Sequence, residues 1–305
     1  MAAVVHAMSG AMRWVDGFIA VDWGTTNRRA YLLDSAGEHR NEFEDSKGVL
    51  SIRAGGFEAA VAEIRERLGD HPMLLAGMIG SNRGWKEAPY VPCPAGLDEI
   101  AAKLVWAGER EAIVPGVSFV GQGRADIMRG EEVQLLGGIA AGLIDPDGFV
   151  CHPGTHNKWA LLRHGLIHLF GTVMTGELFN LLKEHSILAD LLQGPVAAND
   201  AFRRGVRHAL EREMLPADLF GVRAGVLLGQ TESADAPSYT SGLLIGTDVR
   251  IGLTWPLGAQ IAVVGRPELT QLYAAAITEA GRQPTELDGE QCFLAGSLRI
   301  AERIQ

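Results

Sequence analysis

A short turn with phosphate-binding chemistry occurs twice in the sequence. Residues 22–27 read Asp-Trp-Gly-Thr-Thr-Asn, and residues 154–157 repeat the pattern Gly-Thr-x-Asn 130 positions later. Glycine permits a tight turn, whose backbone N–H groups and threonine hydroxyls can bind a phosphate. Asp22, at the end of the preceding strand, can hold Mg²⁺ through water. One such turn is more often an ordinary hairpin, whereas two at domain spacing favour two phosphate-binding loops. The expected ligands are Gly24, Thr25, Thr26, Gly154, Thr155 and Asn157.

Two neighbouring carboxylates, Glu131 and Glu132, begin a predicted helix about twenty residues before the second turn. A carboxylate in this place can accept the proton of a hydroxyl that attacks a γ-phosphate. The alternative is helix capping, because the helix dipole stabilises carboxylates in a first turn without any catalysis. Glu177 and Asp126 are further carboxylates that could serve as the base.

The elements that position these residues follow from the hydrophobic pattern. Each turn lies between two apolar strands, at 17–23 and 28–33 and again at 148–153 and 158–162, and a third strand follows each pair. Apolar residues recur every three to four positions over 57–68, which predicts a helix. Further strands are expected at 73–76, 117–120 and 260–264, and further helices at 97–106, 130–142, 176–192, 199–213, 216–228, 238–252, 267–280 and 293–304. The mixture indicates an α/β protein.

Composition and short motifs exclude several classes of protein. The net charge of −10 argues against nucleic-acid binding, which usually needs a basic surface. Cys93, Cys151 and Cys292 form no Cys-x-x-Cys pair, so neither a zinc site nor a disulfide framework is expected. The sequence has no P-loop, no signal peptide and no apolar stretch long enough to cross a bilayer. We therefore expect a cytoplasmic protein without membrane or nucleic-acid partners, for which a homo-oligomer is compatible with the sequence.

Five segments give the chain a specific family resemblance. They read Val-Asp-Trp-Gly-Thr-Thr-Asn at 21–27, Ala-Gly-Met-Ile-Gly-Ser-Asn-Arg-Gly-Trp at 76–85, Met-Arg-Gly-Glu-Glu at 128–132, Pro-Gly-Thr-His-Asn-Lys-Trp at 153–159 and Val-Met-Thr-Gly-Glu-Leu at 173–178. Together they resemble the signature blocks of the 2-dehydro-3-deoxygalactonokinase family, within the superfamily of sugar kinases, actin and heat-shock ATPases. The blocks are distributed over most of residues 17–305.

The resemblance implies two ribonuclease-H-like domains of the actin-like ATPase kind, each opening with a three-stranded phosphate-binding hairpin, with a cleft between them. The expected division is a flexible lead-in at 1–15, an N-terminal domain at 16–145 and a C-terminal domain at 146–305. In this division, the last helix of the C-terminal domain can pack back toward the N-terminal domain. His152 stands where many members of the superfamily have an aspartate, which leaves Asp22 as the main carboxylate near the metal.

The resemblance also implies binding and catalytic residues. The pattern from Gly130 to Gln134 resembles an exopolyphosphatase block, which favours Glu132 as the base while leaving another carboxylate open. Lys158 either adds charge near the nucleotide or is solvated. Adenosine is expected in the second half at Gly265, Gly296 and Ser297, although single glycines more often serve close packing.

A sugar acid needs hydroxyl partners, an apolar wall and a cation, and a loop held by a scaffold can supply all three. The predicted substrate residues are Ser81, Asn82, Arg83, Trp85, Tyr90 and Arg129, with Arg29 as a further cation. The alternative for Trp85 and Tyr90 is packing beneath the loop.

The activity implied is transfer of the γ-phosphate of ATP, with Mg²⁺, to the 6-hydroxyl of 2-dehydro-3-deoxy-D-galactonate, giving the 6-phosphate and ADP in galactonate catabolism. Three alternatives stay open: a phosphohydrolase of the exopolyphosphatase kind, an ATP-gated interaction module like actin, and a kinase for a related sugar acid such as the gluconate epimer. ADP release that depends on added sugar acid would distinguish the kinase from the hydrolase.

Overall fold

The computed structural model describes residues 14–121, 123–255 and 260–304, which form two compact units. Among the described residues, unit 1 runs to Leu143 and also includes Gly165–Ile167 and the chain from Gln291 onward. Unit 2 comprises Ile144–His164 and His168–Glu290. Most of the predicted lead-in lies outside the described residues, but Trp14 is buried, with its ring centroid 5.6 Å from that of Phe18.

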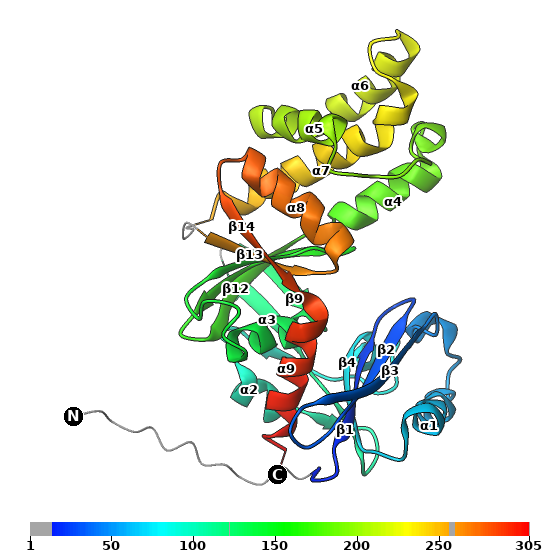
Figure 1. The fold of residues 1–305 in the computed structure, drawn as a ribbon, viewed down its shortest axis with the longest axis vertical. Coiled ribbons are helices and arrows are strands. Elements are labelled where there is room, and N and C mark those ends of the chain that lie inside the picture. Colours follow the sequence, from blue (N-terminus) through cyan, green and yellow to red (C-terminus); the bar gives the residue numbers. More distant parts are fainter. Residues whose placement is uncertain (1–13, 122, 256–259, 305) are drawn as a thin grey trace, which may run out of the picture. The chain divides into compact units, whose positions relative to one another are not determined.

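Unit 1 contains a six-stranded mixed sheet (Figure 1). Its strands are β1 (Phe18–Trp23), β2 (Arg28–Leu33), β3 (His39–Asp45), β4 (Met73–Gly77), β6 (Val105–Trp106) and β7 (Glu111–Ile113), in the order β3-β2-β1-β4-β7-β6. β1 pairs antiparallel with β2 and parallel with β4. The carboxyl ends of β1 and β4 therefore lie next to each other, at the start of the first glycine turn.

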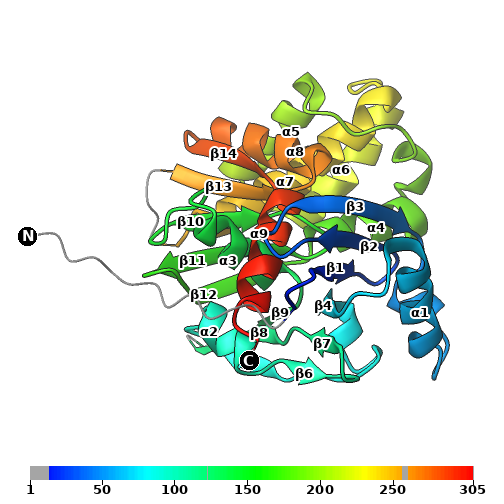
Figure 2. The same ribbon diagram turned by 60° about the horizontal axis from the view of Figure 1, so that its bottom comes forward.

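Helix α1 (Phe57–Leu68) covers one face of this sheet (Figure 2). Phe57, Val61 and Ile64 pack into the same core as Ile19 and Met73, so the predicted periodicity marks the buried side of the helix. Burial of one apolar helix face against a sheet supplies most of the stability of such a helix.

The rest of unit 1 carries the segments that lead into the predicted catalytic helix. A second sheet has the order β5-β8-β9, formed by Tyr90–Pro92, Gly116–Gly121 and Arg124–Met128. The helices are α2 (Leu97–Ala101), α3 (Glu131–Ala140) and most of α9 (Gly289–Ala301). The predicted helix 97–106 is therefore too long, because its last residues form β6.

Unit 2 repeats the strand arrangement of the first sheet. Its strands are β10 (Phe149–His152), β11 (Asn157–Arg163), most of β12 (Leu166–Val173), β13 (Gln260–Gly265) and β14 (Gln283–Asp288), in the order β12-β11-β10-β13-β14. β10 pairs antiparallel with β11 and parallel with β13, as β1 does with β2 and β4. The predicted duplication of turn and strands thus corresponds to a repeated topology.

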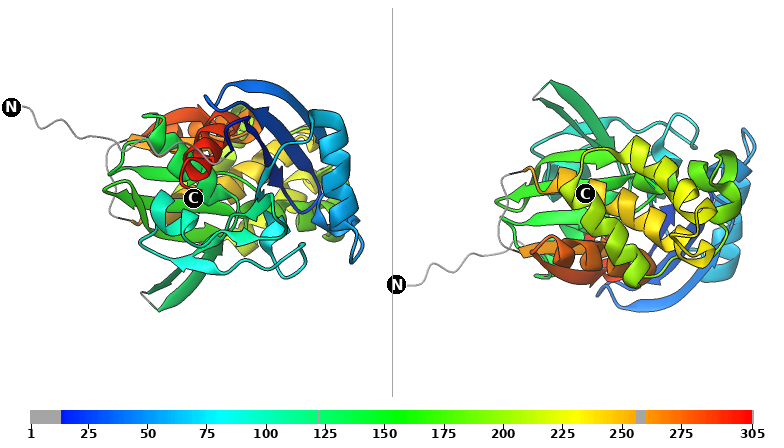
Figure 3. Two further views of the ribbon diagram at one scale, coloured as in Figure 1. Left: turned by 90° about the horizontal axis from the view of Figure 1, so that it is seen from below. Right: turned by 90° about the horizontal axis from the view of Figure 1, so that it is seen from above.

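Five helices pack on one another and on the sheet of unit 2. They are α4 (Thr175–His185), α5 (Asp200–Glu211), α6 (Leu215–Leu227), α7 (Ala236–Gly252) and α8 (Pro267–Glu279), and α5 and α7 lie side by side (Figure 3). A Cβ on Gly242 would lie 2.2 Å from the carbonyl oxygen of Phe202, so glycine is required for this close backbone approach. No helix in the described part of the chain has both the length and the apolar character to cross a membrane.

Candidate functional site

The first glycine turn presents hydrogen-bond donors to solvent. The carbonyl oxygens of Gly24, Thr25 and Thr26 accept hydrogen bonds from the N–H groups of residues 48–50, at 2.9 to 3.2 Å. Thr25 and Thr26 are exposed, and their own N–H and hydroxyl groups have no partner among the described residues. The turn therefore has its acceptors facing the protein and its donors available to an anion.

Gly48 makes this arrangement possible. A Cβ at this position would lie 2.3 Å from the carbonyl carbon of Thr26, although φ of Gly48 is an ordinary −67°. The glycine is therefore required by space and not by backbone conformation. Segment 48–50 acts as the support that holds the turn.

Asp22 lies at the carboxyl end of β1, and one of its two carboxylate oxygens forms an ion pair. Its Oδ2 is 2.6 Å from Nη2 of Arg29, its partner on β2, and the two side chains are only 19% and 21% exposed. Burial lowers the pKa of Arg29, but the charge and hydrogen bond of Asp22, together with Tyr31 and Glu44, outweigh burial and raise this pKa. Oδ1 of Asp22 has no hydrogen-bond partner among the described residues. Arg29, a predicted sugar-acid cation, is thus already neutralised by Asp22.

Helix α3 begins against the same edge of the sheet. A Cβ on Gly130 would lie 3.3 Å from Cα of Gly77, which ends β4, and both glycines have positive φ, 111° and 89°. A Cβ on Gly77 would lie 2.8 Å from the carbonyl oxygen of Trp23 and 3.5 Å from Oδ1 of Asp22. The first turn of α3, the end of β4 and Asp22 therefore converge.

Glu131 and Glu132 cap the start of α3. Both carboxylate oxygens of Glu132 accept from the N–H of Gly130, at 2.9 and 2.7 Å, and Oε2 of Glu131 accepts from the N–H of Arg129 at 2.9 Å. Glu132 is 0% exposed, and burial, followed by the charge of Glu131, raises its pKa to about 8. The capping alternative describes this geometry, and the predicted role of Glu132 as a base stays a prediction.

Arg129 has donors that no described residue uses. Its Nη2 donates to the carbonyl oxygen of Ala88 at 2.8 Å, and its guanidinium carbon lies 4.3 Å from the ring centroid of Tyr90. Nε and Nη1 are buried and have no partner in the described part of the structure. A buried N–H without an acceptor is costly, so a ligand with acceptor oxygens would be favoured at this place.

The predicted sugar-acid loop separates into three environments. Asn82, Arg83 and Trp85 line a cavity of about 520 Å³ together with residues of the 52–58 segment. The ring of Tyr90 instead packs against the guanidinium group of Arg129. The Ser81 hydroxyl is used within its own turn, donating to the carbonyl oxygen of Met78 at 2.7 Å and accepting from the N–H of Arg83. Ser81 therefore shapes the loop, and its predicted contact with substrate stays a prediction.

The second glycine turn is anchored differently from the first. The carbonyl oxygen of Thr155 accepts from the N–H of Glu177 at 3.0 Å, and a Cβ on Gly176 would lie 2.6 Å from the carbonyl oxygen of Gly154. Thr155 and His156 are exposed, and Nε2 of His156 lies 2.5 Å from Oε2 of Glu177. This turn thus rests on the first residues of α4.

Two residues predicted near the nucleotide point inward. Asn157 is 0% exposed and its amide donates to Asp248 at 3.0 Å, so it anchors the turn and its side chain is not available to a phosphate. Lys158 is 5% exposed, in register with His152 on β10, which excludes the solvated alternative.

A cavity of about 280 Å³ adjoins the second turn within unit 2. Gly154, Thr155 and Gly176 form its polar end, and the walls are mostly apolar side chains of α4, α7 and α8, with Asn180 and Ser241 as polar groups. No local sequence pattern indicates this cavity, because its lining comes from helices that are far apart along the chain.

The glycines predicted to contact adenosine have different surroundings. Gly265 ends β13, where an added Cβ would be 3.6 Å from the carbonyl oxygen of Pro153, just before the second turn. Gly296 and Ser297 belong to unit 1, and a Cβ on Gly296 would lie 2.1 Å from the carbonyl oxygen of Val133 on α3. Gly296 therefore serves the close packing of α9 on α3, whereas the Ser297 hydroxyl is buried without a partner among the described residues. Their predicted contact with adenosine stays a prediction.

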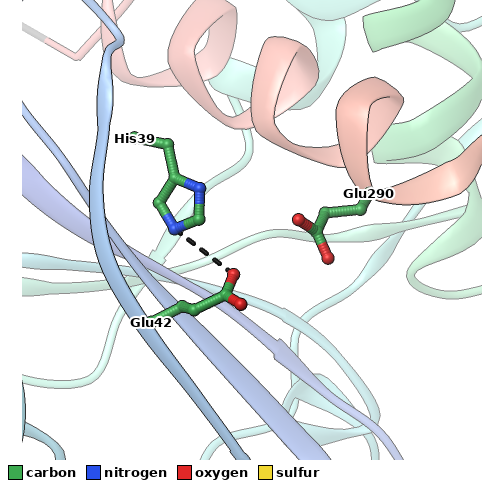
Figure 4. A group of neighbouring side chains, drawn as sticks. All are labelled: His39, Glu42 and Glu290. Carbon is green, nitrogen blue, oxygen red and sulfur yellow. Dashed lines mark ion pairs between the residues drawn. The ribbon is translucent and has the colours of Figure 1, made fainter.

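An exposed histidine on the first sheet pairs with a nearby carboxylate. On strand β3, Nε2 of His39 lies 3.3 Å from Oε2 of Glu42, and both side chains are substantially exposed (Figure 4). Such a solvent-exposed pair contributes little to stability.

Comparisons with known proteins converge on a single family. A family model described as 2-keto-3-deoxy-galactonokinase matches residues 22–300. The 2-dehydro-3-deoxygalactonokinase of Escherichia coli (strain K12) is 36% identical over 291 residues, covering 94% of this chain and 98% of that protein. A crystal structure from Sinorhizobium meliloti, described under the same enzyme name, has a TM-score of 0.87 and 34% identity, covering 93% of this chain and 98% of its own.

Proposed function

The chain belongs to the 2-keto-3-deoxy-galactonokinase family, and we propose that it transfers the γ-phosphate of ATP to the 6-hydroxyl of 2-dehydro-3-deoxy-D-galactonate. The observation that carries the substrate assignment is Arg129. Its Nε and Nη1 are buried without a partner among the described residues, directly before the carboxylates that begin α3. A sugar acid brings the carboxylate that such donors bind and the hydroxyl that a nearby base can deprotonate.

We assign the two sheets to ribonuclease-H-like units, in which each glycine turn is a phosphate-binding hairpin. The exposed donors of Thr25 and Thr26 support this assignment for unit 1. In unit 2, the cavity beside Gly154 and Thr155 suits a nucleoside, because apolar walls with a few polar groups are typical of small-molecule sites.

The residues at the end of β1 fit a magnesium ion bound mainly by phosphates. Asp22 keeps one carboxylate oxygen, Oδ1, without a partner among the described residues, while Oδ2 is neutralised by Arg29. Magnesium usually takes one or two carboxylates and completes its shell with water and phosphate oxygens. When bound, the ion supplies charge neutralisation on the transferring phosphoryl group. The contribution of this chain is to hold Asp22 in place through the Arg29 pair.

In the proposed reaction, Arg129 binds the carboxylate of the sugar acid and thereby orients its hydroxyl chain. Glu132 accepts the proton of the 6-hydroxyl, and its raised pKa of about 8 gives it a basicity close to the working pH. The proposal requires that its carboxylate exchange the N–H of Gly130 for the hydroxyl when substrate binds.

The test is ADP release from ATP with and without sugar acid, using the galactonate and gluconate epimers. Release that depends on the galactonate compound supports the proposal, equal release without any sugar acid indicates a hydrolase, and preference for the gluconate compound reassigns the substrate. Arg129→Met should raise KM for the sugar acid at least tenfold, the expected loss for a charged hydrogen bond. Arg40→Met, which removes an exposed arginine of β3, is the matched control.

A further inference from the structure

Unit 2 contains a buried carboxylate that the proposed chemistry does not use. Asp248 of α7 is 0% exposed. Its Oδ1 accepts from Nδ2 of Asn157 at 3.0 Å and from Nε1 of Trp159 at 2.7 Å. Its Oδ2 accepts from the hydroxyls of Thr175 at 2.5 Å and Tyr273 at 2.6 Å. Four donors occupy the acceptor sites of a carboxylate, which has about four.

Three of the four donors belong to the nucleotide cavity or its adjoining turn. Thr175 and Tyr273 line the cavity. Gly176, the next residue after Thr175, touches the backbone of the second turn, and Asn157 is the last residue of that turn. Asp248 therefore connects three parts of one site: the turn, the start of α4 and the wall formed by α8.

Burying a carboxylate at this position costs free energy that an apolar side chain would not cost. Its partners Trp159 and Tyr273 belong to an apolar core cluster, and burial raises the pKa of Asp248 although the four hydrogen bonds oppose this. Well-packed apolar residues often stabilise a core more than a buried charge does. A fully bonded polar network, in contrast, fixes a single arrangement of its members.

We propose that Asp248 is a positioning residue for the nucleotide: its carboxylate locks the second glycine turn and the cavity wall in the arrangement that binds ATP. The proposal rests on the proposed function, in which the nucleotide occupies this cavity. Asp248 touches no substrate itself and acts through Asn157, Thr175 and Tyr273.

The primary test is Asp248→Asn, which keeps the size of the side chain but replaces one acceptor with an N–H₂ donor. We expect KM for ATP to rise roughly tenfold or more, because a hydrogen-bond network with a charged member is disrupted. KM for the sugar acid should change less than twofold, because Arg129 and its neighbours belong to unit 1. Tyr273→Phe and Thr175→Val remove one hydroxyl each, and each should raise KM for ATP severalfold.

Thr240→Val is the matched control on the same helix. The Thr240 hydroxyl is buried and has no hydrogen-bond partner in the described part of the chain, and the residue does not line the cavity. This variant should leave both KM values and the binding of ADP unchanged.

A purely structural role predicts a different result. Lower melting temperature and lower kcat, with unchanged KM for ATP in the Asp248, Tyr273 and Thr175 variants, would overturn the proposal. If Asp248→Asn does not fold, the two hydroxyl variants decide the question through direct titration with ADP. A wild-type protein that binds no ADP overturns both this inference and the proposed function, whereas wild-type binding with normal affinity in the variants overturns only this one.

Discussion

At the scale of single residues, Asp22 uses one carboxylate oxygen for an ion pair, and the other is the proposed ligand of a metal ion. Oδ2 is fixed by Arg29 and Oδ1 has no partner among the described residues. Asp22→Asn should retain the fold but lower kcat roughly 10²-fold or more, because an amide neither bears the charge nor binds the cation as well. Steady-state kinetics over a range of Mg²⁺ concentrations measures this. Asp34→Asn, at an exposed pair, is the control, and normal turnover of Asp22→Asn at saturating Mg²⁺ contradicts the metal role.

Glu132 is the residue whose catalytic role most needs a direct test. Glu132→Gln keeps size and polarity but removes the base, so kcat should fall by roughly 10²–10⁴-fold. Both KM values should change little, because the loss is confined to the transition state. Glu131→Gln is the control, since its side chain projects about 100° away around the helix axis. A large loss in Glu131→Gln alone would reverse the assignment, and mild effects in both would leave helix capping as their role.

The buried Glu132 also predicts a pH dependence of stability. Its pKa rises from 4.5 to about 8 on folding, mainly through burial. Between these pH values the folded chain retains a proton that the unfolded chain releases, so this residue's contribution to the free energy of unfolding falls as pH rises and is constant above about 8. In Glu132→Gln no carboxyl group titrates at this position, so this contribution to the pH dependence of unfolding is absent.

The stability of Glu132→Gln relative to wild type should therefore improve, by an order of a few kcal/mol, as pH rises from 5 to 9. Urea unfolding at several pH values measures the difference. A difference that stays constant with pH would show that the Glu132 carboxylate titrates normally in the folded protein.

The sequence identified many of the residues of the candidate site but not their orientation. Gly24, Thr25 and Thr26 lie at an exposed turn, as the pattern indicated, because a Gly-Thr turn between apolar strands depends on local geometry. Asn157 occupies the equivalent place in the second turn and points inward, since Asp248, ninety-one residues later, accepts its amide. A partner at that distance along the chain leaves no local trace in a single sequence.

At the scale of elements, predictability follows the length and apolar character of each segment. Strands β1, β2, β10 and β11 and helix α1 were predicted because they carry continuous or periodic apolar residues. Strand β9 was missed, because alternate residues in it are exposed and its edge position lets it be polar. Strand β14 was also missed, since Pro284 and two acidic residues argue against a strand, and its pairing with β13 is not visible in the sequence.

Gly176 allows a prediction about how an element supports a turn. Gly176→Ala would place Cβ 2.6 Å from the carbonyl oxygen of Gly154, so the second turn must shift. We expect KM for ATP to rise roughly tenfold, the effect of losing about one well-placed phosphate hydrogen bond. Gly221→Ala on α6 is the control, because nothing lies within 4 Å of its added Cβ. The control should be neutral or stabilised by up to about 1 kcal/mol, and normal KM in Gly176→Ala would contradict the supporting role.

At the scale of the whole molecule, the chain does not divide simply into two halves. The end of the chain belongs to unit 1, where α9 and α3 approach so closely that a Cβ on Gly137 would lie 1.9 Å from the carbonyl oxygen of Cys292. Both helices contain glycines, but the sequence alone does not predict that these two helices contact each other, because a small residue can pack against many different partners. Such long-range pairing appears only in the folded chain.

The division into units predicts that the two substrates protect different peptides from hydrogen exchange. The sugar acid should slow exchange in residues 80–90 and 124–132, because Arg129 and the loop belong to unit 1. ADP should slow exchange in residues 154–158, 174–180 and 269–273, which surround the cavity of unit 2. Bound ligand suppresses local opening, so protection reports where each ligand lies.

Mass spectrometry with each ligand alone measures both protection patterns. The Arg129→Met variant should lose the protection by the sugar acid while retaining the protection by ADP. Sugar-acid protection confined to unit 2 would remove Arg129 from the substrate site.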